Sequence, residues 1–349
     1  MDGRPVKRIV FFTAAPIVMA LLMVAAVLTG PAGMAPGTVL RVLAAKLLPQ
    51  GVIDAAGLKE AHFVVVWNLR VPRAVVGAIV GAALAVAGAV LQALFRNPLA
   101  EPGLTGTSAG AVLGAVMAFS LGWSAAHPVA LPAAGMIGAL GALLTVYAMA
   151  TRGGVTPMMT LLLAGVAVSS LLSAAAGLIL SLQINNWQIA HEIVFWTMGG
   201  LEARTWTHVW LSLPFAAAGF VVARFCATEL DLMQQGEEVA ASLGVEVEAM
   251  KRLLIGAAAV MTGSAVAVAG VIGFVGLVAP HATRLLLGPL HRILLPASAL
   301  AGAILLLACD LAARSIHPPV EIRLGVVTAL IGGPLFLWLL MRRSREGGL

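Results

Sequence analysis

The sequence predicts an all-α integral membrane protein with about ten transmembrane helices, and three observations support this fold class. Of the 349 residues, 60% are hydrophobic and only 10% are charged, whereas a soluble domain carries about 25% charged residues. The mean hydropathy is +1.01. The apolar runs are also long, and a membrane-crossing helix needs about 20 apolar residues. These properties exclude a disordered chain, a coiled coil and a soluble nucleotide-binding domain.

Ten apolar runs follow one another along the chain and define the expected spans. They cover residues 9–30, 64–95, 104–121, 129–150, 158–182, 206–225, 253–272, 274–287, 293–313 and 324–341. Glycine and alanine interrupt several runs, and such small residues allow transmembrane helices to pack closely. The first run imitates a signal peptide, but it is longer than the 7–15 residues of a signal-peptide core. We therefore interpret it as the first span.

Basic residues predict how the spans are oriented. They precede the first span and follow the last one, at Arg4, Lys7, Arg8, Arg342, Arg343 and Arg345. Lys and Arg near span ends favour the cytoplasmic side, and an even number of crossings places both termini there. The net charge of +6 is thus assigned to membrane-flanking loops and not to nucleic-acid binding. Residues 183–205 become an outer loop, and residues 226–252 become the long cytoplasmic loop.

The chain reads as a single transmembrane domain, 1–349, with a weak internal repeat. Aligned against itself, it matches Gly81 with Gly263, Pro98 with Pro280, and the Ala-Val-Ala-Gly at 85–88 with the same four residues at 267–270. Helices 2–5 and 7–10 would then be equivalent and run in opposite directions, in halves of about 1–182 and 206–349. Such an inverted repeat is typical of transporters.

The charged residues bear on the energy source. An ion-coupled transporter retains ionisable residues inside the membrane, and Asp310 is the best candidate. Arg314 follows four residues later on the same helical face, so a paired structural or docking role is favoured. The energy is then expected from outside this chain. A secondary transporter or a passive channel that works alone remains the alternative.

An enzymatic function is not expected. The chain has no Gly-x-x-x-x-Gly-Lys-Ser/Thr loop for ATP, no clustered Ser, His and Asp, and no spacing typical of metal ligands. Cys226 and Cys309 lie too far apart in the sequence to form a metal or redox motif. We therefore predict no catalytic residue, no metal site and no cofactor bound by this chain.

A short helix is predicted within the cytoplasmic loop. The segment GEEVAASLG (236–244) has Glu237 and Glu238 where a helix begins, small residues in its middle, and Gly244 as a stop. A solvated surface helix would have the same pattern. The segment from Glu238 to Gly244 also looks like the Glu-Ala-Ala-x-x-x-Gly loop by which permease subunits of ATP-binding-cassette importers grip their ATPase, with Val239 in the middle place.

Further ordered blocks carry a more specific resemblance, from Trp67 to Leu340. The blocks include RVPR (70–73), GAALAVAG (81–88), RNPLAEP (96–102), GFVGLVAPH (273–281), HR (291–292) and GVVTALIGGP (325–334). They resemble the FecCD-type permease subunits of importers for iron-siderophores, haem and cobalamin. The resemblance implies a homodimer, two ATPase subunits that use ATP, a periplasmic substrate-binding protein, and alternating access in the bacterial inner membrane. An iron chelate is the expected cargo, and cobalamin is the alternative.

The resemblance also implies roles for particular residues. Coupling to the ATPase is expected at Glu237, Glu238, Ala240, Ala241 and Gly244. Docking of the binding protein is expected at Arg70, Arg73 and Arg314, because arginine makes bidentate bonds with carboxylates. Their alternative role is to anchor the chain at the membrane interface.

A structural role in cytoplasmic turns is expected for a third set of residues. This set contains Arg96, Asn97, Pro98, Glu101, His281, Arg284, His291 and Arg292, with a possible pair between Arg96 and Glu101. Iron ligation by His281 or His291 is disfavoured, because their blocks occur in relatives that carry no haem.

Residues of the translocation path are least tied to the resembling blocks. Met158 and Met159 stand where the resemblance leads us to expect small polar residues, and His191 lies in the outer loop. Thioethers suit a large planar ligand, although methionine is also a general gap-filler.

Overall fold

The computed structural model describes residues 4–30, 33–49, 57–318 and 320–345. The side chains of Arg4, Arg342, Arg343 and Arg345, on which part of the expected orientation depends, lie outside the described residues. Apart from an isolated β-bridge between Arg152 and Val155, the regular elements of the described part are helices. These are α1 (Arg4–Leu28), α2 (Pro36–Leu47), α3 (Glu60–Phe63), η1 (Val64–Arg70), α4 (Val71–Leu94), η2 (Pro102–Thr105), α5 (Thr107–Ser120), α6 (Trp123–Ala126), α7 (Ala130–Ala150), α8 (Met158–Leu182), α9 (Trp187–Thr197), α10 (Trp206–Phe225), α11 (Ala227–Gln235), α12 (Glu237–Ser242), α13 (Val247–Ala269), α14 (Val275–Leu287), α15 (His291–Ser315) and α16 (Leu324–Arg345).

The predicted fold class is confirmed. Within the described residues, seven helices are long and apolar enough to cross a membrane: α1, the continuous helix Glu60–Leu94, α7, α8, α10, α13 and α15. The shorter apolar helices are α5, α14 and the first part of α16. These elements coincide with the ten predicted apolar runs.

Several helices lie where the sequence predicted loops. The loop at 226–252 contains α11 in addition to the predicted short helix α12, and α13 begins at Val247 instead of 253. The loop at 183–205 contains α9, which Asn186 caps by accepting a hydrogen bond from the Ile189 amide at 3.4 Å. The unpredicted helices α9 and α11 are short or partly polar, so a search for long apolar runs does not detect them.

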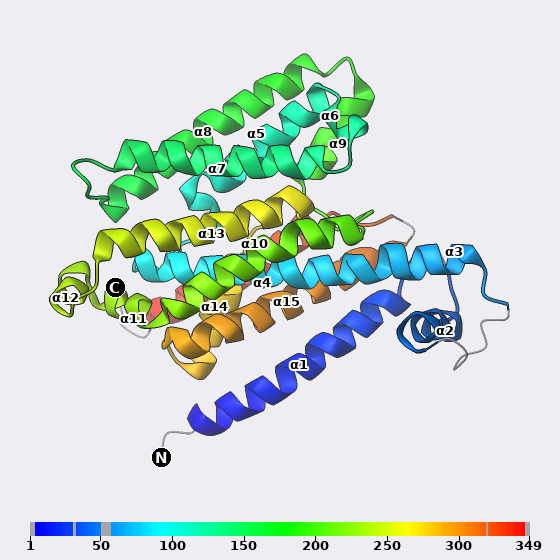
Figure 1. The fold of residues 1–349 in the computed structure, drawn as a ribbon, viewed down its shortest axis with the longest axis horizontal. Helices are drawn as coiled ribbons and strands as arrows, with labels where there is room; N and C mark the ends of the chain where they lie inside the picture. The colour runs from blue at the N-terminus through cyan, green and yellow to red at the C-terminus, as the bar shows by residue number, and fades with distance from the viewer. Residues whose placement is uncertain (1–3, 31–32, 50–56, 319, 346–349) are drawn as a thin grey trace.

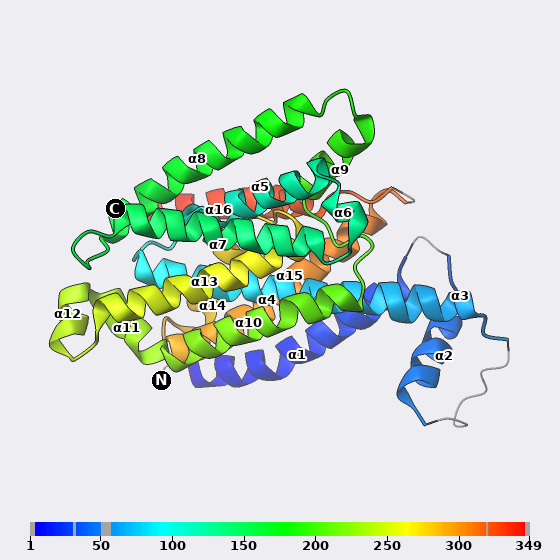
Figure 2. The same ribbon diagram turned by 45° about the horizontal axis from the view of Figure 1, so that its top comes forward.

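The spans lie roughly parallel along the longest axis of the molecule (Figure 1). One end, which we call the α12 end, carries α11, α12 and the turn between α7 and α8. The opposite end, which we call the α9 end, carries α2, α3 and α9. The α1 helix begins at the α12 end, and Figure 2 shows α16 running back toward that end. This arrangement agrees with an even number of crossings.

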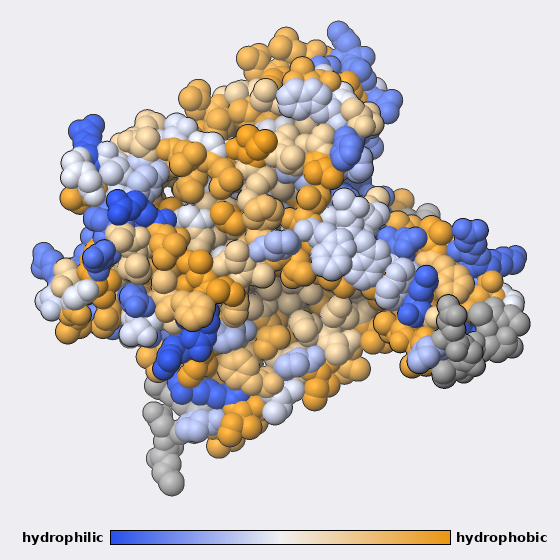
Figure 3. Space-filling view, in the orientation of Figure 1, coloured by the Kyte–Doolittle hydropathy of each residue, from blue (hydrophilic) through white to orange (hydrophobic). Residues whose placement is uncertain are grey.

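Side-chain polarity follows the same axis. Hydrophobic residues cover most of the middle of the visible face, and hydrophilic residues gather toward its two ends (Figure 3). A surface of this kind suits a protein whose middle lies in lipid and whose ends lie in water.

Close helix packing depends on small residues in the core. A Cβ atom on Gly81 of α4 would overlap the carbonyl oxygen of Gly302 in α15. In the other half, a Cβ on Gly263 of α13 would lie 3.0 Å from the Ala139 side chain of α7. Gly81 and Gly263 are matched positions of the predicted repeat, and the helices that carry them, α4 and α13, run in opposite directions (Figure 1). The packing therefore agrees with an inverted repeat.

Candidate functional site

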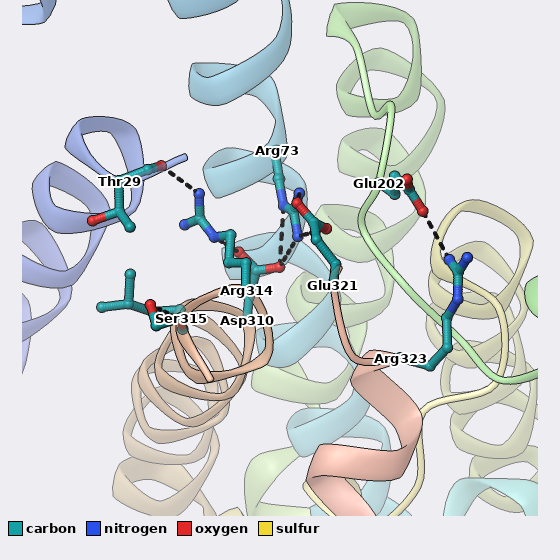
Figure 4. Close-up of polar contacts among 9 residues, drawn as sticks. Thr29, Arg73, Glu202, Asp310, Arg314, Ser315, Glu321 and Arg323 are labelled. Atoms are coloured by element: carbon teal, nitrogen blue, oxygen red, sulfur yellow. Dashed lines mark hydrogen bonds and ion pairs between the residues drawn. The ribbon is translucent and has the colours of Figure 1, made fainter. Parts of the chain in front are cut away.

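A buried ion-pair cluster lies at the α9 end (Figure 4). Arg73 of α4 donates two hydrogen bonds to the same carboxylate oxygen of Asp310 in α15, at 3.1 and 2.8 Å. It donates a third to Glu321, before α16, at 2.9 Å. The exposed fraction is 13% for the Arg73 side chain and 1% for that of Asp310. Three elements that are distant in the sequence are therefore held together by one guanidinium group.

The other two predicted docking arginines are also bonded inside the chain. Arg314 lies 3.2 Å from the second carboxylate oxygen of Asp310, as the predicted pairing requires, and donates to the Thr29 carbonyl at 2.7 Å. Arg70 donates to the carbonyls of Val27 and Leu28, at 3.0 and 3.1 Å. Because the last carbonyls of a helix have no partner within that helix, these arginines satisfy the end of α1. Their proposed role in docking stays a prediction.

A second ion pair, Arg323 with Glu202, and a further arginine, Arg204, lie near this cluster. Arg323 donates to Glu202 at 2.9 Å, and its guanidinium carbon lies 4.0 Å from the centre of the Phe195 ring. Burial, with the nearby charges of Arg73 and Arg323, lowers the pKa of Arg204 to about 10, so this side chain is still protonated at neutral pH. The α9 end therefore carries more arginine than carboxylate among these groups.

At the opposite end, α12 has the form that the sequence predicted. Gly236 and Gly244, with φ of 141° and 87°, bracket the helix in conformations that favour glycine. Ala240 is fully buried, whereas Val239 and Leu243 are 45% and 62% exposed. Ala241 and Glu238 are exposed as well. The helix thus anchors itself through one small residue and presents a mixed apolar and acidic surface outward.

Glu237, in the first turn of α12, makes a contact that the sequence analysis missed. Its carboxylate accepts a hydrogen bond from Lys251 of α13 at 2.6 Å, and the Lys251 side chain is completely buried. Lys251 falls near the end of the predicted cytoplasmic loop, 226–252, for which the sequence predicts no side-chain partner. A possible signal was its spacing from Glu248, three residues earlier on the same helix.

The turn between α4 and η2 also lies at the α12 end. Arg96 is exposed and has a φ of 49°, and Asn97 accepts a hydrogen bond from the Leu99 amide at 2.9 Å. The carboxylate of Glu101 accepts from the amide of Phe274 at 2.9 Å, instead of pairing with Arg96 as expected. Phe274 is the N-cap of α14, and the first amides of a helix lack intrahelical acceptors.

The predicted structural histidine His291 joins two helices. Its side-chain Nδ1 lies 2.6 Å from a carboxylate oxygen of Asp231 in α11, and its backbone amide donates to the same oxygen at 3.0 Å. The imidazole is fully buried within this chain, so it is not exposed to iron or haem in solution. In the same region, Arg284 of α14 is partly buried and Arg292 is exposed, while Pro98 and His281 are partly buried.

The predicted path residues are not brought together. Met158 and Met159 begin α8 at the α12 end, whereas His191 lies on α9 at the other end (Figure 1). The His191 ring stacks on Phe195 with ring centres 3.9 Å apart. A cavity of about 510 Å³ lies between α5, α7 and α8, and its lining is mostly apolar. Within the described residues, no three His, Cys, Asp or Glu side chains gather as metal ligands would.

Comparisons with known proteins agree with these features. The chain is 47% identical over 215 residues to the cobalamin import system permease protein BtuC of Halobacterium salinarum, covering 61% of this chain and 56% of that protein. It is 41% identical over 210 residues to the hemin transport system permease protein HmuU of Yersinia pestis, covering 60% of this chain and 62% of that protein. The chain thus spans little more than half the length of these curated relatives.

A solved structure and a family model cover far more of the chain. The structure is described as an inward-facing conformation of a metal-chelate type ABC transporter. It has a TM-score of 0.82 and 28% identity, and the match covers 95% of this chain and 99% of that one. The model of the FecCD transport family matches residues 17–342. Because this match covers nearly the whole chain, including the Arg73 cluster and α12, the chain belongs to the FecCD transport family.

Proposed function

We propose that this chain is the permease subunit of an ATP-driven importer that moves a large metal chelate across the bacterial inner membrane. The observation that carries the proposal is α12. This short helix stands between two glycines at one end of an apolar bundle, exposes Val239 and Leu243, and is tied to the spans through Glu237. Such a helix can receive a soluble partner and pass its movement to the spans.

The proposed assembly contains two copies of this chain, two ATPase subunits and a periplasmic substrate-binding protein. ATP would be bound and hydrolysed by the ATPase subunits, which would contact Glu238, Ala241 and Gly244 on α12. The α12 end and both termini would then face the cytoplasm. A second copy would cover part of α8, of whose most apolar 18-residue stretch only 17% is buried within this chain.

The binding protein would dock at the α9 end. The positive charge there favours a partner that presents carboxylates, because complementary charge steers association. Arg70, Arg73 and Arg314 are the proposed docking residues. Since each of them already bonds within the chain, an incoming carboxylate would have to share or replace an acceptor such as Glu321, whose side chain is 18% exposed.

The proposed cargo is an iron chelate, either a ferric siderophore or haem, and the alternative is cobalamin. The relatives named above transport hemin in one case and cobalamin in the other, and the cobalamin permease has the higher identity. Met158, Met159 and His191 are the proposed path residues. Transport would proceed by alternating access, with the two halves rocking when the ATPases close.

Reconstitution in vesicles tests the proposal. We expect uptake of the chelate to require the binding protein, the ATPase subunits and ATP, and Gly244→Asp to abolish it while the protein remains in the membrane. A side chain at Gly244 has open space around it, so the backbone strain is limited to about 1–2 kcal/mol.

The matched control is Gly122→Asp at the α9 end, which has a φ of 73° and equally open surroundings. Its strain is the same, but it lies far from α12, so uptake should persist. Wild-type uptake in the Gly244→Asp variant would refute coupling through α12. Uptake driven by an ion gradient without ATPase subunits would instead identify a secondary transporter.

A further inference from the structure

We propose that Lys251 is a positioning residue that transmits the movement of α12 to the beginning of α8. This inference rests on the proposed function, because it assumes that α12 receives the ATPase. It adds a specific route from that contact to a membrane-spanning helix.

The ammonium group of Lys251 joins three separate segments. Its Nζ donates to Glu237 of α12 at 2.6 Å, to Glu248 of α13 at 2.8 Å, and to the Thr156 carbonyl at 3.0 Å. An ammonium group has three hydrogens to donate, so each hydrogen has an acceptor. The Lys251 side chain is completely buried, whereas its acceptors Glu237 and Glu248 are 41% and 26% exposed, so Lys251 connects the surface of α12 to the interior.

Thr156 is held on both sides of its peptide backbone. Its carbonyl accepts from Lys251, and its amide donates to the second carboxylate oxygen of Glu248 at 3.0 Å. Its hydroxyl donates to the hydroxyl of Tyr147 in α7 at 3.0 Å. The turn between α7 and α8 is therefore fixed to α13 at a single residue.

The same turn begins α8. Thr156 precedes Pro157, the N-cap of α8, and Met158 is the first residue of that helix. The α12 helix packs on α11 and α13, whereas α8 packs on α5, α7 and η2. Lys251 is thus placed where a displacement of α12 can reach α8 without passing through the packed core.

The electrostatics favour movement as a unit. A buried cation that loses an acceptor is costly, because its desolvation is no longer compensated. If α12 shifts relative to α13, Lys251 must either follow Glu237 or lose its shortest bond. The Thr156 carbonyl, which shares the ammonium group, is then pulled or released with it.

Glu237→Gln separates transmission from folding. This variant removes the charge that links α12 to Lys251, but it leaves the bonds of Lys251 with Glu248 and Thr156 in place. Glu246→Gln is the matched control, because Glu246 is an exposed carboxylate in the same segment and lies outside this network. Lys251→Met removes all three hydrogen bonds of the ammonium group, whereas Lys251→Arg keeps a cationic donor and should retain part of the coupling.

The experiment measures chelate uptake and ATP hydrolysis in the same vesicles, with the ATPase subunits and the binding protein present. We expect Glu237→Gln to lower the uptake per ATP hydrolysed by about fivefold or more, which is the range of ordinary site-to-site coupling. ATP hydrolysis and assembly with the ATPase should be retained. Glu246→Gln should keep the wild-type ratio.

A spin label at Thr160→Cys, an exposed position in the first turn of α8, gives a second readout. Cys226 and Cys309 are buried, so labelling is directed to position 160. We expect an ATP-dependent change in the distance between the two labels of a homodimer, and a smaller change when Glu237→Gln is added. If Lys251 had only a structural role, Glu237→Gln would leave the ATP-dependent change in this distance unaltered.

The outcomes separate the two proposals. If the unmodified chain shows no ATP-driven uptake, the proposed function fails. If it does, but Glu237→Gln keeps the wild-type ratio and the wild-type label movement, transmission through Lys251 is wrong. A parallel loss of ATP hydrolysis and uptake would also overturn it, because the contact would then serve assembly.

Discussion

Neutralising Asp310 should destabilise the protein substantially. In the Asp310→Asn variant, the shape of the side chain is kept and its charge is lost. Asp310 accepts two hydrogen bonds from Arg73 and lies 3.2 Å from Arg314. One carboxylate therefore compensates two guanidinium groups that are largely withdrawn from water.

The expected magnitude follows from the remaining partners. Breaking a buried ion pair by removing one member costs about 3–5 kcal/mol, because an uncompensated charge is left behind. Arg73 still has Glu321, Arg314 still has the Thr29 carbonyl, and the asparagine oxygen can still accept a bond. We therefore expect a loss near the lower bound, about 3 kcal/mol.

The assay is reversible unfolding of the purified protein in one detergent mixture, with Asp310→Asn compared to the unmodified chain. Glu202→Gln is the control, because Glu202 pairs with Arg323 but is 58% exposed, and exposed pairs contribute about 0–1 kcal/mol. A loss below about 1 kcal/mol for Asp310→Asn, or an equal loss for both variants, would show that the cluster is not a stabilising contact between α4 and α15.

Two further substitutions test the packing and the histidine. Gly88→Ala should destabilise by about 3 kcal/mol or more, because the new Cβ would overlap the carbonyl of Gly276 in α14. In contrast, a Cβ at Gly256 in the middle of α13 would meet no neighbouring atom, so Gly256→Ala should stabilise the protein by up to about 1 kcal/mol. The same unfolding assay checks both variants, and equal effects would contradict the close contact of α4 with α14 at Gly88. His291→Asn should cost about 1–3 kcal/mol through the lost bond to Asp231. With haem added, the His291→Asn variant should have the same absorbance spectrum as the unmodified chain. Loss of a haem band in the variant would support ligation by His291.

The spans could be predicted because they depend on local composition. An apolar run such as 158–182 is a helix in the structure with the same bounds, Met158–Leu182, since in lipid each backbone amide and carbonyl must be satisfied within the segment. The α12 helix was equally accessible, because acidic residues at its start and Gly244 at its stop are local signals.

Apart from the pair of Asp310 and Arg314, which lie four residues apart on one helix, the partners of charged residues could not be predicted in the same way. Arg73 and Asp310 are separated by 237 positions in the sequence, and no spacing rule connects them. Glu101 was expected to pair with its neighbour Arg96, yet it binds an amide on α14. Lys251 fell within the predicted loop 226–252 because the next apolar run begins at residue 253. Such contacts depend on how the two halves of the chain meet, which local patterns do not encode.

Two cations, Arg73 and Lys251, link the two halves of the chain. Arg73 lies in the first half and binds Asp310 in the second, whereas Lys251 lies in the second half and binds Thr156 in the first. One link is at the α9 end and the other at the α12 end. Between them, α4 and α13 have 78% of their most apolar stretches buried, against 17% for α8.

Elements with few buried contacts open at the lowest free-energy cost, and close-packed interiors resist continuous deformation. In the isolated chain, α8 is therefore expected to move before α4 or α13 does. Its first turn is gripped through Thr156 by the buried Lys251, which also holds α12. In the proposed importer a second copy would cover part of α8, so a force applied at α12 would pass through Lys251 to a helix at the subunit interface, while α13 stays within the packed core.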